Sequence, residues 1–283
     1  MDAAAKKIKG KGAIRRPFSL DKTSRFTDNI SEVKKMGKYD GILICTDIDG
    51  TLTYESGKVS EENLRAIEYF ISEGGIFTIS SGRNPNFVLD LNVPVSAPII
   101  AFNGSLIFSS QSGKIIRETF LPGEAFPVIK EAYHLFRDKV NYLKCFSKSK
   151  EYSTESDDES FIEISENVYK AVFFAKSEED ALLIRDYIIE NSNGDYDVSR
   201  SWETGVEVIP KNGNKGSAGL FLKEYLGAKT YIAIGDFEND ISMLKAADIS
   251  YAVENASDEI KAYAKAIAPK KTGHAIRYII EKI

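Results

Sequence analysis

The sequence has few of the residues that oxidative folding or histidine-based catalysis requires. Its 283 residues include only two cysteines and two histidines. Cys45 and Cys145 cannot build a disulfide framework, so we expect a reducing, cytoplasmic compartment. No acid and nucleophile are grouped around His134 or His274, so a Ser-His-Asp mechanism lacks its base.

Long hydrophobic runs are also missing. No segment approaches the roughly 20 apolar residues that a membrane span needs, and the first residues lack the apolar core of a secretory signal. Hydrophobic residues make up 43% of the chain and charged residues 28%, which is typical of a globular protein with a sizeable core. We therefore expect no membrane association.

Charge is distributed unevenly along the chain. Residues 1–38 hold eleven Lys and Arg against four acids, whereas the formal net charge of the whole chain is −5. We interpret residues 1–38 as a basic N-terminal extension that is solvated or packed at a domain edge. Because no groove-reading motif or interleaved aromatic residues accompany these lysines, we do not expect nucleic acid as a partner.

The rest of the chain predicts an α/β fold. Short buried runs alternate with amphipathic segments, which favours a parallel sheet with right-handed crossovers. The predicted strands are 41–46, 76–79, 98–102, 231–234 and 249–253. One predicted helix is capped by Ser60, and the other predicted helices of the core cover 216–226, 240–247, 258–266 and 275–283. Between these two halves the pattern changes to that of an α+β insert. We place the core at 39–120 and 205–283, and the insert at 121–204.

Acidic residues follow two of the predicted core strands. Asp47 and Asp49 come directly after the first strand, and Asp236 follows the strand 231–234. Because ligands of open parallel sheets bind beyond the carboxyl ends of the strands, we expect these three carboxylates to lie close together. Such a cluster needs a cation, and hard oxygen ligands favour Mg²⁺. One of Asp47 and Asp49 could attack phosphorus while the other donates a proton.

Donors for a phosphoryl group follow other elements. Ser81, Gly82 and Arg83 come after the second strand and offer a hydroxyl, an unhindered amide and a guanidinium. Lys215 stands at the start of a predicted helix, where its ammonium and the free amides can neutralise an anion. Gly50 allows the backbone to turn sharply beside a phosphate.

Taken in order, these motifs resemble those of the haloacid dehalogenase superfamily, in particular its Cof-type sugar phosphatases with a large cap. Asp47–Thr51 matches Asp-x-Asp-Gly-Thr, Ser81–Arg83 matches the second motif with Ser in place of the commoner Thr, Lys215 matches the third-motif lysine, and Gly235–Asp240 matches Gly-Asp-x-x-Asn-Asp. The pair Asn103-Gly104 matches the Asn-Gly of this branch. The loop 269–273 and the extension 1–38 depart from the family pattern.

The resemblance implies a Rossmann-like core with an inserted α+β cap at 121–204. It implies that Asp47 is the nucleophile, Asp49 the general acid and base, and that Ser81 and Lys215 hold the phosphoryl oxygens. The implied Mg²⁺ site consists of Asp47, the main-chain carbonyl of Asp49, Asp236 and the supporting Asp240. The implied substrate-binding residues are Gly50, Gly82, Arg83, Asn103, Gly104 and Asn239.

The predicted function is a Mg²⁺-dependent phosphatase that acts on a small phosphorylated metabolite, in particular a sugar phosphate, through an aspartyl-phosphate. We expect a monomer or a weak homodimer. A phosphomutase acting on hexose phosphates is an alternative, since it would use the same core residues. A non-catalytic phospho-acceptor or anion-binding protein is another alternative.

Overall fold

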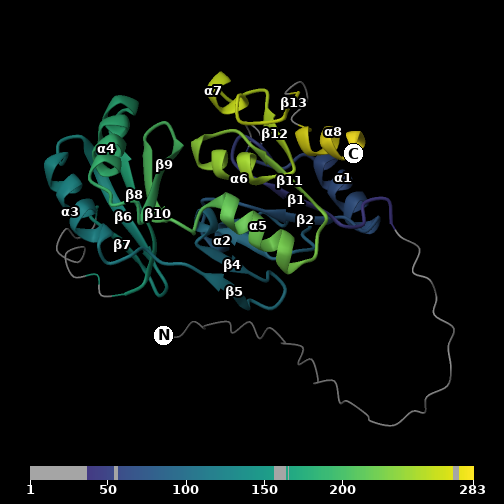
Figure 1. The fold of residues 1–283 in the computed structure, drawn as a ribbon, viewed down its shortest axis with the longest axis horizontal. Helices are drawn as coiled ribbons and strands as arrows, with labels where there is room; N and C mark the ends of the chain where they lie inside the picture. The colour runs from purple at the N-terminus through teal and green to yellow at the C-terminus, as the bar shows by residue number, and fades with distance from the viewer. Residues whose placement is uncertain (1–36, 54–56, 156–163, 165, 270–273) are drawn as a thin grey trace, which may run out of the picture. The chain divides into compact units, whose positions relative to one another are not determined.

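The computed structural model describes residues 37–53, 57–155, 164, 166–269 and 274–283 (Figure 1). All but the last two residues of the predicted basic extension 1–38 lie outside this part of the chain, and so does the loop 270–273.

A parallel five-stranded sheet forms the centre of the core. Its strands are β1 (Ile42–Thr46), β2 (Ile76–Ile79), β11 (Thr230–Gly235), β12 (Ile249–Val253) and β13 (Ala266–Ala268), in the order β13-β12-β11-β1-β2. All four pairings are parallel. The α/β fold predicted from the sequence is confirmed. The carboxyl ends of β1 and β11, the strands that precede the acidic motifs, are therefore neighbours.

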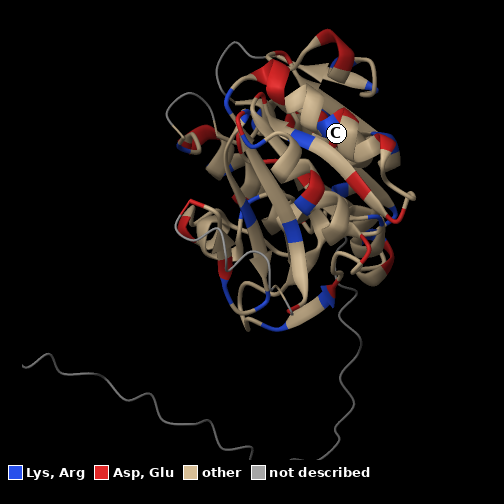
Figure 2. Cartoon of the chain, turned by 90° about the vertical axis from the view of Figure 1, so that its left-hand side faces the viewer, with Lys and Arg blue, Asp and Glu red and all other residues tan. Residues whose placement is uncertain are grey.

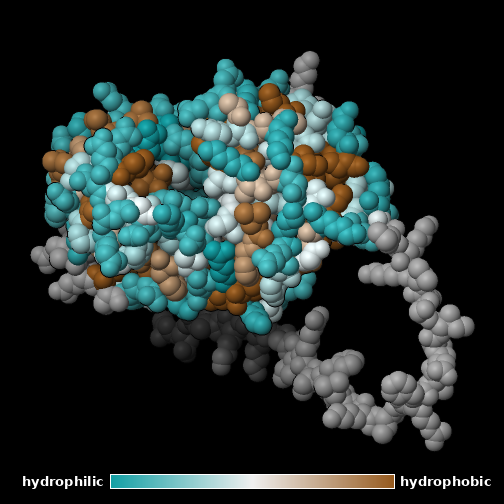
Figure 3. Space-filling model, viewed as in Figure 1, coloured by the Kyte–Doolittle hydropathy of each residue, from teal (hydrophilic) through white to brown (hydrophobic). Residues whose placement is uncertain are grey.

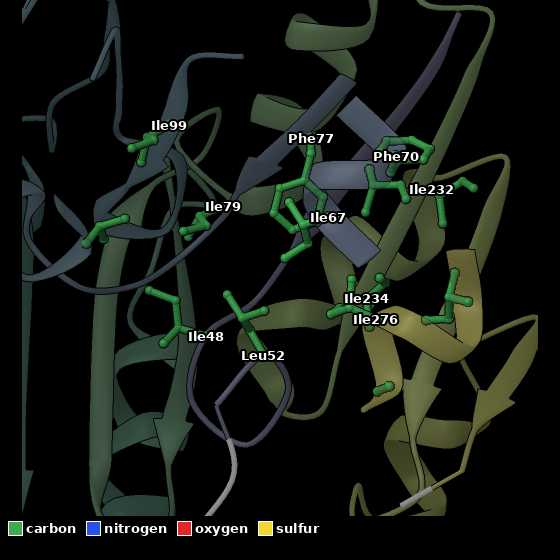
Figure 4. Close-up of a cluster of buried hydrophobic side chains, with 14 of the residues drawn as sticks. Ile48, Leu52, Ile67, Phe70, Phe77, Ile79, Ile99, Ile232, Ile234 and Ile276 are labelled. Atoms are coloured by element: carbon green, nitrogen blue, oxygen red, sulfur yellow. The ribbon is translucent and has the colours of Figure 1, made fainter. Parts of the chain in front are cut away.

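Helices cover both faces of this sheet because alternate residues of each strand point to opposite sides. Ile44 of β1 packs in one hydrophobic cluster with α1 (Glu61–Ser72) and α8 (Ala275–Lys282). Figure 4 shows this cluster, with Ile67 of α1 and Ile276 of α8 labelled. Cys45, the next residue of β1, packs in another cluster with α5 (Lys215–Tyr225) and α6 (Ile241–Ala246).

The beginning of α1 follows the local chemistry of its sequence. The Ser60 hydroxyl accepts a hydrogen bond from the main-chain N–H of Asn63 at 3.2 Å and so caps the helix. Glu61 and Glu62 occupy the first turn, where negative charge interacts favourably with the helix dipole. A helix that begins after Ser60 was predicted from these residues, and the structure confirms it.

Two predicted elements differ in the structure. The segment 98–102 was expected to join the parallel sheet, but β3 (Ile99–Ala101) pairs antiparallel with β4 (Leu106–Phe108), which in turn pairs with β5 (Ile115–Glu118). A single parallel bridge, Ser80–Ile100, connects β3 to the end of β2. The predicted length of the helix at 258–266 was also wrong. The helix ends after one turn, as α7 (Asp258–Lys261), because the chain then extends and adds β13 at the edge of the parallel sheet.

The insert forms a second, antiparallel sheet with its own hydrophobic cluster. Its strands are β6 (Val140–Ser147), β7 (Glu151–Ser153), β8 (Val168–Ala175), β9 (Tyr196–Trp202) and β10 (Gly205–Pro210), in the order β7-β6-β8-β10-β9. The helices α3 (Ala125–Leu135) and α4 (Glu178–Glu190) pack against one face. Because β10 pairs with β8 and β9, this sheet continues six residues past the boundary predicted at residue 204. We call this α+β part the cap.

Basic and acidic residues are mixed along the described chain. Figure 2 shows the positions of Lys and Arg interspersed with those of Asp and Glu. In Figure 3 hydrophobic side chains form scattered patches in a mainly hydrophilic surface. Among the described residues, no helix combines the length and the apolar composition that crossing a bilayer demands.

Candidate active site

Three carboxylates gather at the carboxyl ends of β1 and β11. Because Thr46 is in register with Ile234, Asp47 and Asp236 leave the sheet at the same edge. Asp47, Asp236 and Asp240 each place a carboxylate oxygen within 4.8 Å of the others. The Asp49 side chain, expected in this group, instead accepts hydrogen bonds from Arg83, at 2.9 Å from Nε and 3.2 Å from Nη2. The chain turns after Asp47, so the two aspartates of the first motif point to different partners.

The ammonium group of Lys215 neutralises part of this cluster. Lys215 is completely buried at the start of α5, and its Nζ lies 2.5 Å from Asp47 Oδ1 and 2.6 Å from Asp240 Oδ1. The other oxygen of Asp240 accepts the main-chain N–H groups of Asp236 and Phe237, at 2.9 and 3.2 Å. Asp240 is thus held from both sides, and it fixes the loop that carries Asp236.

Burial dominates the protonation equilibria of this cluster. Burial raises the pKa of Asp47 well above its usual value, the Lys215 ammonium opposes this shift, and Asp240 and Asp236 add to it. Burial and the neighbouring Asp240 raise the pKa of Asp236 to about 7. Burial alone would lower the pKa of Lys215, but Asp240 and Asp47 outweigh it and raise that pKa. The three carboxylates therefore carry more negative charge than Lys215 neutralises, as is expected of a site that binds a divalent cation.

The turn after the first motif is tightly constrained. Gly50 has φ +82°, and a Cβ at this position would lie 2.3 Å from Asp236 Oδ2. The Thr51 hydroxyl donates a hydrogen bond of 2.6 Å to Asp236 Oδ1. Only glycine fits this conformation beside the carboxylate without strain, so Gly50 and Thr51 together hold Asp236 against the first-motif loop.

The second motif lies beside the first. Ser81 is buried, and its hydroxyl accepts the main-chain N–H of Arg83 at 3.1 Å. Arg83 itself is half exposed and reaches Asp49. The Gly82 carbonyl accepts a hydrogen bond of 2.8 Å from Lys170, a residue of cap strand β8. This loop is therefore a point where the core meets the cap.

Asn103 forms a second point of contact between core and cap, and Gly104 follows it. Asn103 adopts the left-handed conformation with φ +60°, which asparagine tolerates better than most residues. Its amide donates a short hydrogen bond to Glu207 of β10 and accepts one of 3.1 Å from Asn239. Gly104 has φ +116°, and a Cβ there would lie 2.3 Å from the Asn214 carbonyl. The predicted substrate residues Asn103 and Asn239 thus contact each other.

Several cap residues at this interface were not predicted. Lys170 and Glu207 form a buried ion pair at 2.6 Å, and burial lowers the pKa of Lys170 despite the attraction of Glu207. On the other side, Arg200 lies 2.6 Å from Glu238, which occupies a variable position of the fourth motif. Arg185 of α4 also contacts Glu238, at 3.4 Å. No local pattern in the sequence indicates these pairs, since each joins residues far apart in the chain.

Asn214 connects the cap to the helix that carries Lys215. Its side-chain oxygen accepts the main-chain N–H of Ser217 at 2.9 Å and caps α5. Its amide nitrogen donates a 2.8 Å hydrogen bond to Asp197 of β9. One side chain therefore joins a cap strand to the first turn of α5.

A cavity of about 730 Å³ lies between these parts of the core and the cap. Core residues on its wall include Asp47, Asp49, Ser81, Arg83, Asp236 and Asn239. Cap residues on its wall include Phe146, Lys170, Val172, Phe174, Ser201, Trp202 and Glu207. The cavity is large enough for a small ligand, and it brings most of the predicted site residues to one place.

The donor set suits a hard divalent cation. Within the described part of the chain, Asp47 and Asp236 each keep one carboxylate oxygen without a hydrogen bond, in a buried group that has more negative than positive charge. Oxygen-only ligands of this kind favour Mg²⁺ over softer metals. Asp240 already uses both oxygens in contacts to Lys215 and to main-chain N–H groups, so it supports the site from outside.

Comparisons with known proteins agree with this geometry. The family model described as haloacid dehalogenase-like hydrolase matches residues 44–280. The 5-amino-6-(5-phospho-D-ribitylamino)uracil phosphatase YwtE of Bacillus subtilis is 26% identical, over 85% of this chain and 97% of that protein. The chloroplastic endoribonuclease YBEY of Arabidopsis thaliana is 25% identical over 92% of this chain, which spans only 50% of that protein. A haloacid dehalogenase-like hydrolase from B. subtilis has the same fold, with a TM-score of 0.74 at 21% identity, covering 85% of this chain and 99% of that one.

Proposed function

Since this chain belongs to the haloacid dehalogenase-like hydrolases and is a phosphatase, we propose that it hydrolyses a small phosphorylated metabolite, a sugar phosphate, with Mg²⁺ and through an aspartyl-phosphate. The observation that carries the proposal is the buried carboxylate cluster that opens, with Asp49, Ser81 and Arg83, into one cavity. The relative YwtE is named for a substrate with a phosphorylated ribityl chain, which supports a sugar-like leaving group.

Asp47 is the proposed nucleophile. One of its oxygens contacts Lys215, and the other is free to attack phosphorus while the bond from phosphorus to the ester oxygen breaks. Ser81 and Lys215 hold the phosphoryl oxygens. Asp47, the Asp49 carbonyl and Asp236 would hold Mg²⁺, which supplies positive charge to the phosphoryl oxygens.

Asp49 is the proposed acid and base. It gives a proton to the departing alcohol oxygen, then takes one from the water that attacks the aspartyl-phosphate, so that inorganic phosphate leaves and Asp47 is restored. Before substrate binds, Asp49 is paired with Arg83. The phosphate group competes for the same guanidinium, so we expect binding to free Asp49 for proton transfer.

A reducing cytoplasm remains the proposed compartment. Both cysteines are buried free thiols, and burial raises the pKa of each. A buried thiol with a raised pKa is a poor nucleophile, so we assign neither cysteine a role in the reaction.

Phosphate release from sugar phosphates, measured with Mg²⁺ and with EDTA, tests the proposal. We expect Mg²⁺-dependent release that Asp47→Asn reduces by at least a thousandfold, because the amide cannot act as the nucleophile. Asp90→Asn is the matched control, since Asp90 is an exposed aspartate of the short helix α2 (Pro85–Asp90) outside the cavity. Substantial activity of Asp47→Asn would contradict the proposal. Transfer of phosphate to a second sugar hydroxyl, visible by ³¹P NMR, would instead identify a phosphomutase.

A further inference from the structure

Main-chain hydrogen bonds from the turn after β3 hold the second-motif loop. The N–H of Asn103 donates to the Ser81 carbonyl at 2.9 Å. The N–H of Phe102 donates to the Arg83 carbonyl at 3.1 Å. A Cβ at Gly82 would lie 3.0 Å from Asn103 Oδ1, so this loop packs directly on the Asn103 side chain. The place of the Ser81 hydroxyl, proposed to hold phosphate, therefore depends on how the turn at Asn103 is fixed.

This turn has a main-chain conformation that its residues rarely adopt. Phe102 has φ +50° and Asn103 has φ +60°, both in the left-handed region. Such a conformation is costly for a bulky residue, and it persists only where the surrounding contacts determine it. The Phe102 ring stacks on the Tyr169 ring of β8, with the centroids 5.1 Å apart. The Asn103 side chain contacts Glu207 of β10. Two cap strands therefore hold the turn in place.

The buried carboxylate of Glu207 connects two sides of this loop. One of its oxygens accepts a hydrogen bond of 2.6 Å from Lys170 Nζ, and the other accepts one from the Asn103 amide. Lys170 in turn donates a hydrogen bond of 2.8 Å to the Gly82 carbonyl. The second-motif loop is thus bound on one side through Lys170 and on the other through Asn103, and Glu207 joins the two sides. We call Lys170, Glu207 and Asn103 the anchoring group.

The chemistry of Glu207 sets the orientation of its neighbours. A carboxylate only accepts hydrogen bonds, so the Asn103 amide turns its nitrogen toward Glu207 and its oxygen toward Asn239, which donates to it at 3.1 Å. Fold stability alone does not account for the ion pair of Lys170 and Glu207, since apolar residues of similar volume often replace a buried ion pair without loss. What the ion pair adds is a fixed direction for each hydrogen bond of the anchoring group.

We propose that Glu207 is a positioning residue for phosphate binding, and that it acts through Lys170 and Asn103. These two residues hold the main-chain carbonyls of Gly82 and Ser81, and so keep the Ser81 hydroxyl where it can donate to a phosphoryl oxygen. Glu207 does not contact the phosphate itself, because two anions repel each other. This inference rests on the proposed phosphatase function, and it adds a residue on which the reaction depends without contact to the reacting atoms.

Inhibition by inorganic phosphate tests the inference, measured on the full chain with Mg²⁺ and with p-nitrophenyl phosphate as substrate. Glu207→Gln keeps the size of the side chain, but one end of its amide donates and cannot accept from either neighbour. We expect this variant to raise the Ki for phosphate and to lower kcat/KM by about tenfold or more each, because small displacements of a binding group are costly. Lys170→Met should have the same effects.

The control for both variants is Asp180→Asn. It breaks another lysine–carboxylate pair of the cap, that of Lys139 and Asp180, which lies outside the cavity. Because a Ki does not depend on the concentration of folded enzyme, partial unfolding of a variant cannot mimic the expected change. An unchanged Ki for phosphate in both Glu207→Gln and Lys170→Met would overturn the inference and leave the phosphatase function standing.

Two substrates distinguish positioning from direct contact with the leaving group. Ribose 5-phosphate and p-nitrophenyl phosphate share only the phosphate group. Because the anchoring group acts on the loop that binds phosphate, Glu207→Gln should lower kcat/KM by the same factor for both substrates. A loss confined to ribose 5-phosphate would show that Glu207 contacts the sugar, and it would overturn the inference.

A double variant, Lys170→Met with Glu207→Met, separates positioning from fold stability. Lys170→Met alone leaves a buried carboxylate without its cation, whereas the double variant removes both charges. We therefore expect the double variant to melt at a higher temperature than Lys170→Met. Its Ki for phosphate should stay raised by about tenfold or more, because the Gly82 carbonyl and the Asn103 amide still lack their partners. Recovery of the Ki together with the melting temperature would contradict positioning.

The Mg²⁺ requirement gives a further readout. Asp236 is held by Thr51 and Asp240, and none of these substitutions changes either contact. The Mg²⁺ concentration for half-maximal activity should therefore stay within about twofold in Glu207→Gln. A rise as large as that of the Ki for phosphate would indicate general damage to the site and contradict the inference. Absence of phosphate release from both substrates by the unsubstituted chain would refute the phosphatase function instead.

Discussion

The buried ammonium of Lys215 is expected to stabilise the fold as well as the site. Lys215→Met keeps the length of the side chain but leaves Asp47 and Asp240 buried without their shared cation. Removal of one partner from a buried ion pair costs about 3–5 kcal/mol. For a chain of this size each kcal/mol lowers the melting temperature by about 2–4 °C, so we expect the variant to melt about 10 °C lower.

The loss of stability should depend on pH. Burial already raises the pKa of Asp47 in the presence of Lys215, and without the lysine this shift increases. A carboxyl group whose pKa is higher in the folded than in the unfolded state binds more protons when folded, so the free energy of unfolding falls as pH rises. The free energy of unfolding that Lys215→Met loses relative to the unsubstituted chain should therefore be largest near pH 8 and smaller toward pH 5.

Urea and thermal unfolding, followed by far-UV circular dichroism in EDTA from pH 5 to 8, measure both effects. Lys139→Met is the control, because Lys139 forms a more exposed ion pair with Asp180 at 3.0 Å. Pairs of that kind contribute about 0–1 kcal/mol. A deficit below about 1 kcal/mol for Lys215→Met at pH 8, or one that is the same at pH 5, would refute the reasoning.

Three further substitutions test other parts of the structure. Asp236→Asn should raise the Mg²⁺ concentration for half-maximal activity by about tenfold or more, and an unchanged Mg²⁺ titration would argue against its role as a ligand. Gly50→Ala should lower kcat by about tenfold or more, since its Cβ would meet the Asp236 carboxylate at 2.3 Å; kinetics at saturating Mg²⁺ measure this, and an unchanged kcat would show that the turn relaxes. Asp248→Ala removes hydrogen bonds to the Lys223 ammonium and the Tyr231 N–H, which lower the Asp248 pKa. Because Asp248 is partly exposed, the expected loss is at most about 1 kcal/mol at pH 7. The loss is complete above the unfolded-state pKa and disappears as pH falls through the lower folded-state pKa; a loss that persists at pH 3 in urea unfolding would contradict this assignment.

The core could be predicted because its signals are local. A short apolar run followed by acids predicts a strand with a site at its end, and the structure has β1 and β11 side by side with Asp47 and Asp236 at one edge. The N-cap of α1 at Ser60 could also be predicted, because the beginning of a helix depends on neighbouring residues only.

The prediction of the carboxylate cluster was partly wrong because side-chain direction in a turn is not encoded by spacing. Asp47 and Asp49 are two residues apart, yet the Asp49 side chain turns to Arg83. The third carboxylate of the cluster is Asp240, which the family resemblance had placed in support of the metal site. The length of α7 was overestimated because local preference did not decide it. The sequence after Lys261 continues to favour a helix, but the chain extends there and forms the edge strand β13 of the parallel sheet.

The contacts between cap and core could not be predicted from the sequence. Lys170 and Glu207 are charged residues in strands that otherwise read as apolar, and nothing nearby indicates that they pair with each other and with the core. Arg200 and Glu238 are likewise joined only by the folded chain. Such pairs depend on register across the sheet and on how the cap meets the core, and a single sequence specifies neither by a local rule.

The double hydrogen bonding of Asn214 has a mechanical consequence. Because its nitrogen binds β9 and its oxygen binds the first turn of α5, the position of the cap and the position of the Lys215 ammonium depend on each other. Asp197 is bound to Asn214, and Asn214 directly precedes Lys215 at the start of α5. We therefore expect that a displacement of Asp197 in the cap would also displace the Lys215 ammonium, which contacts Asp47.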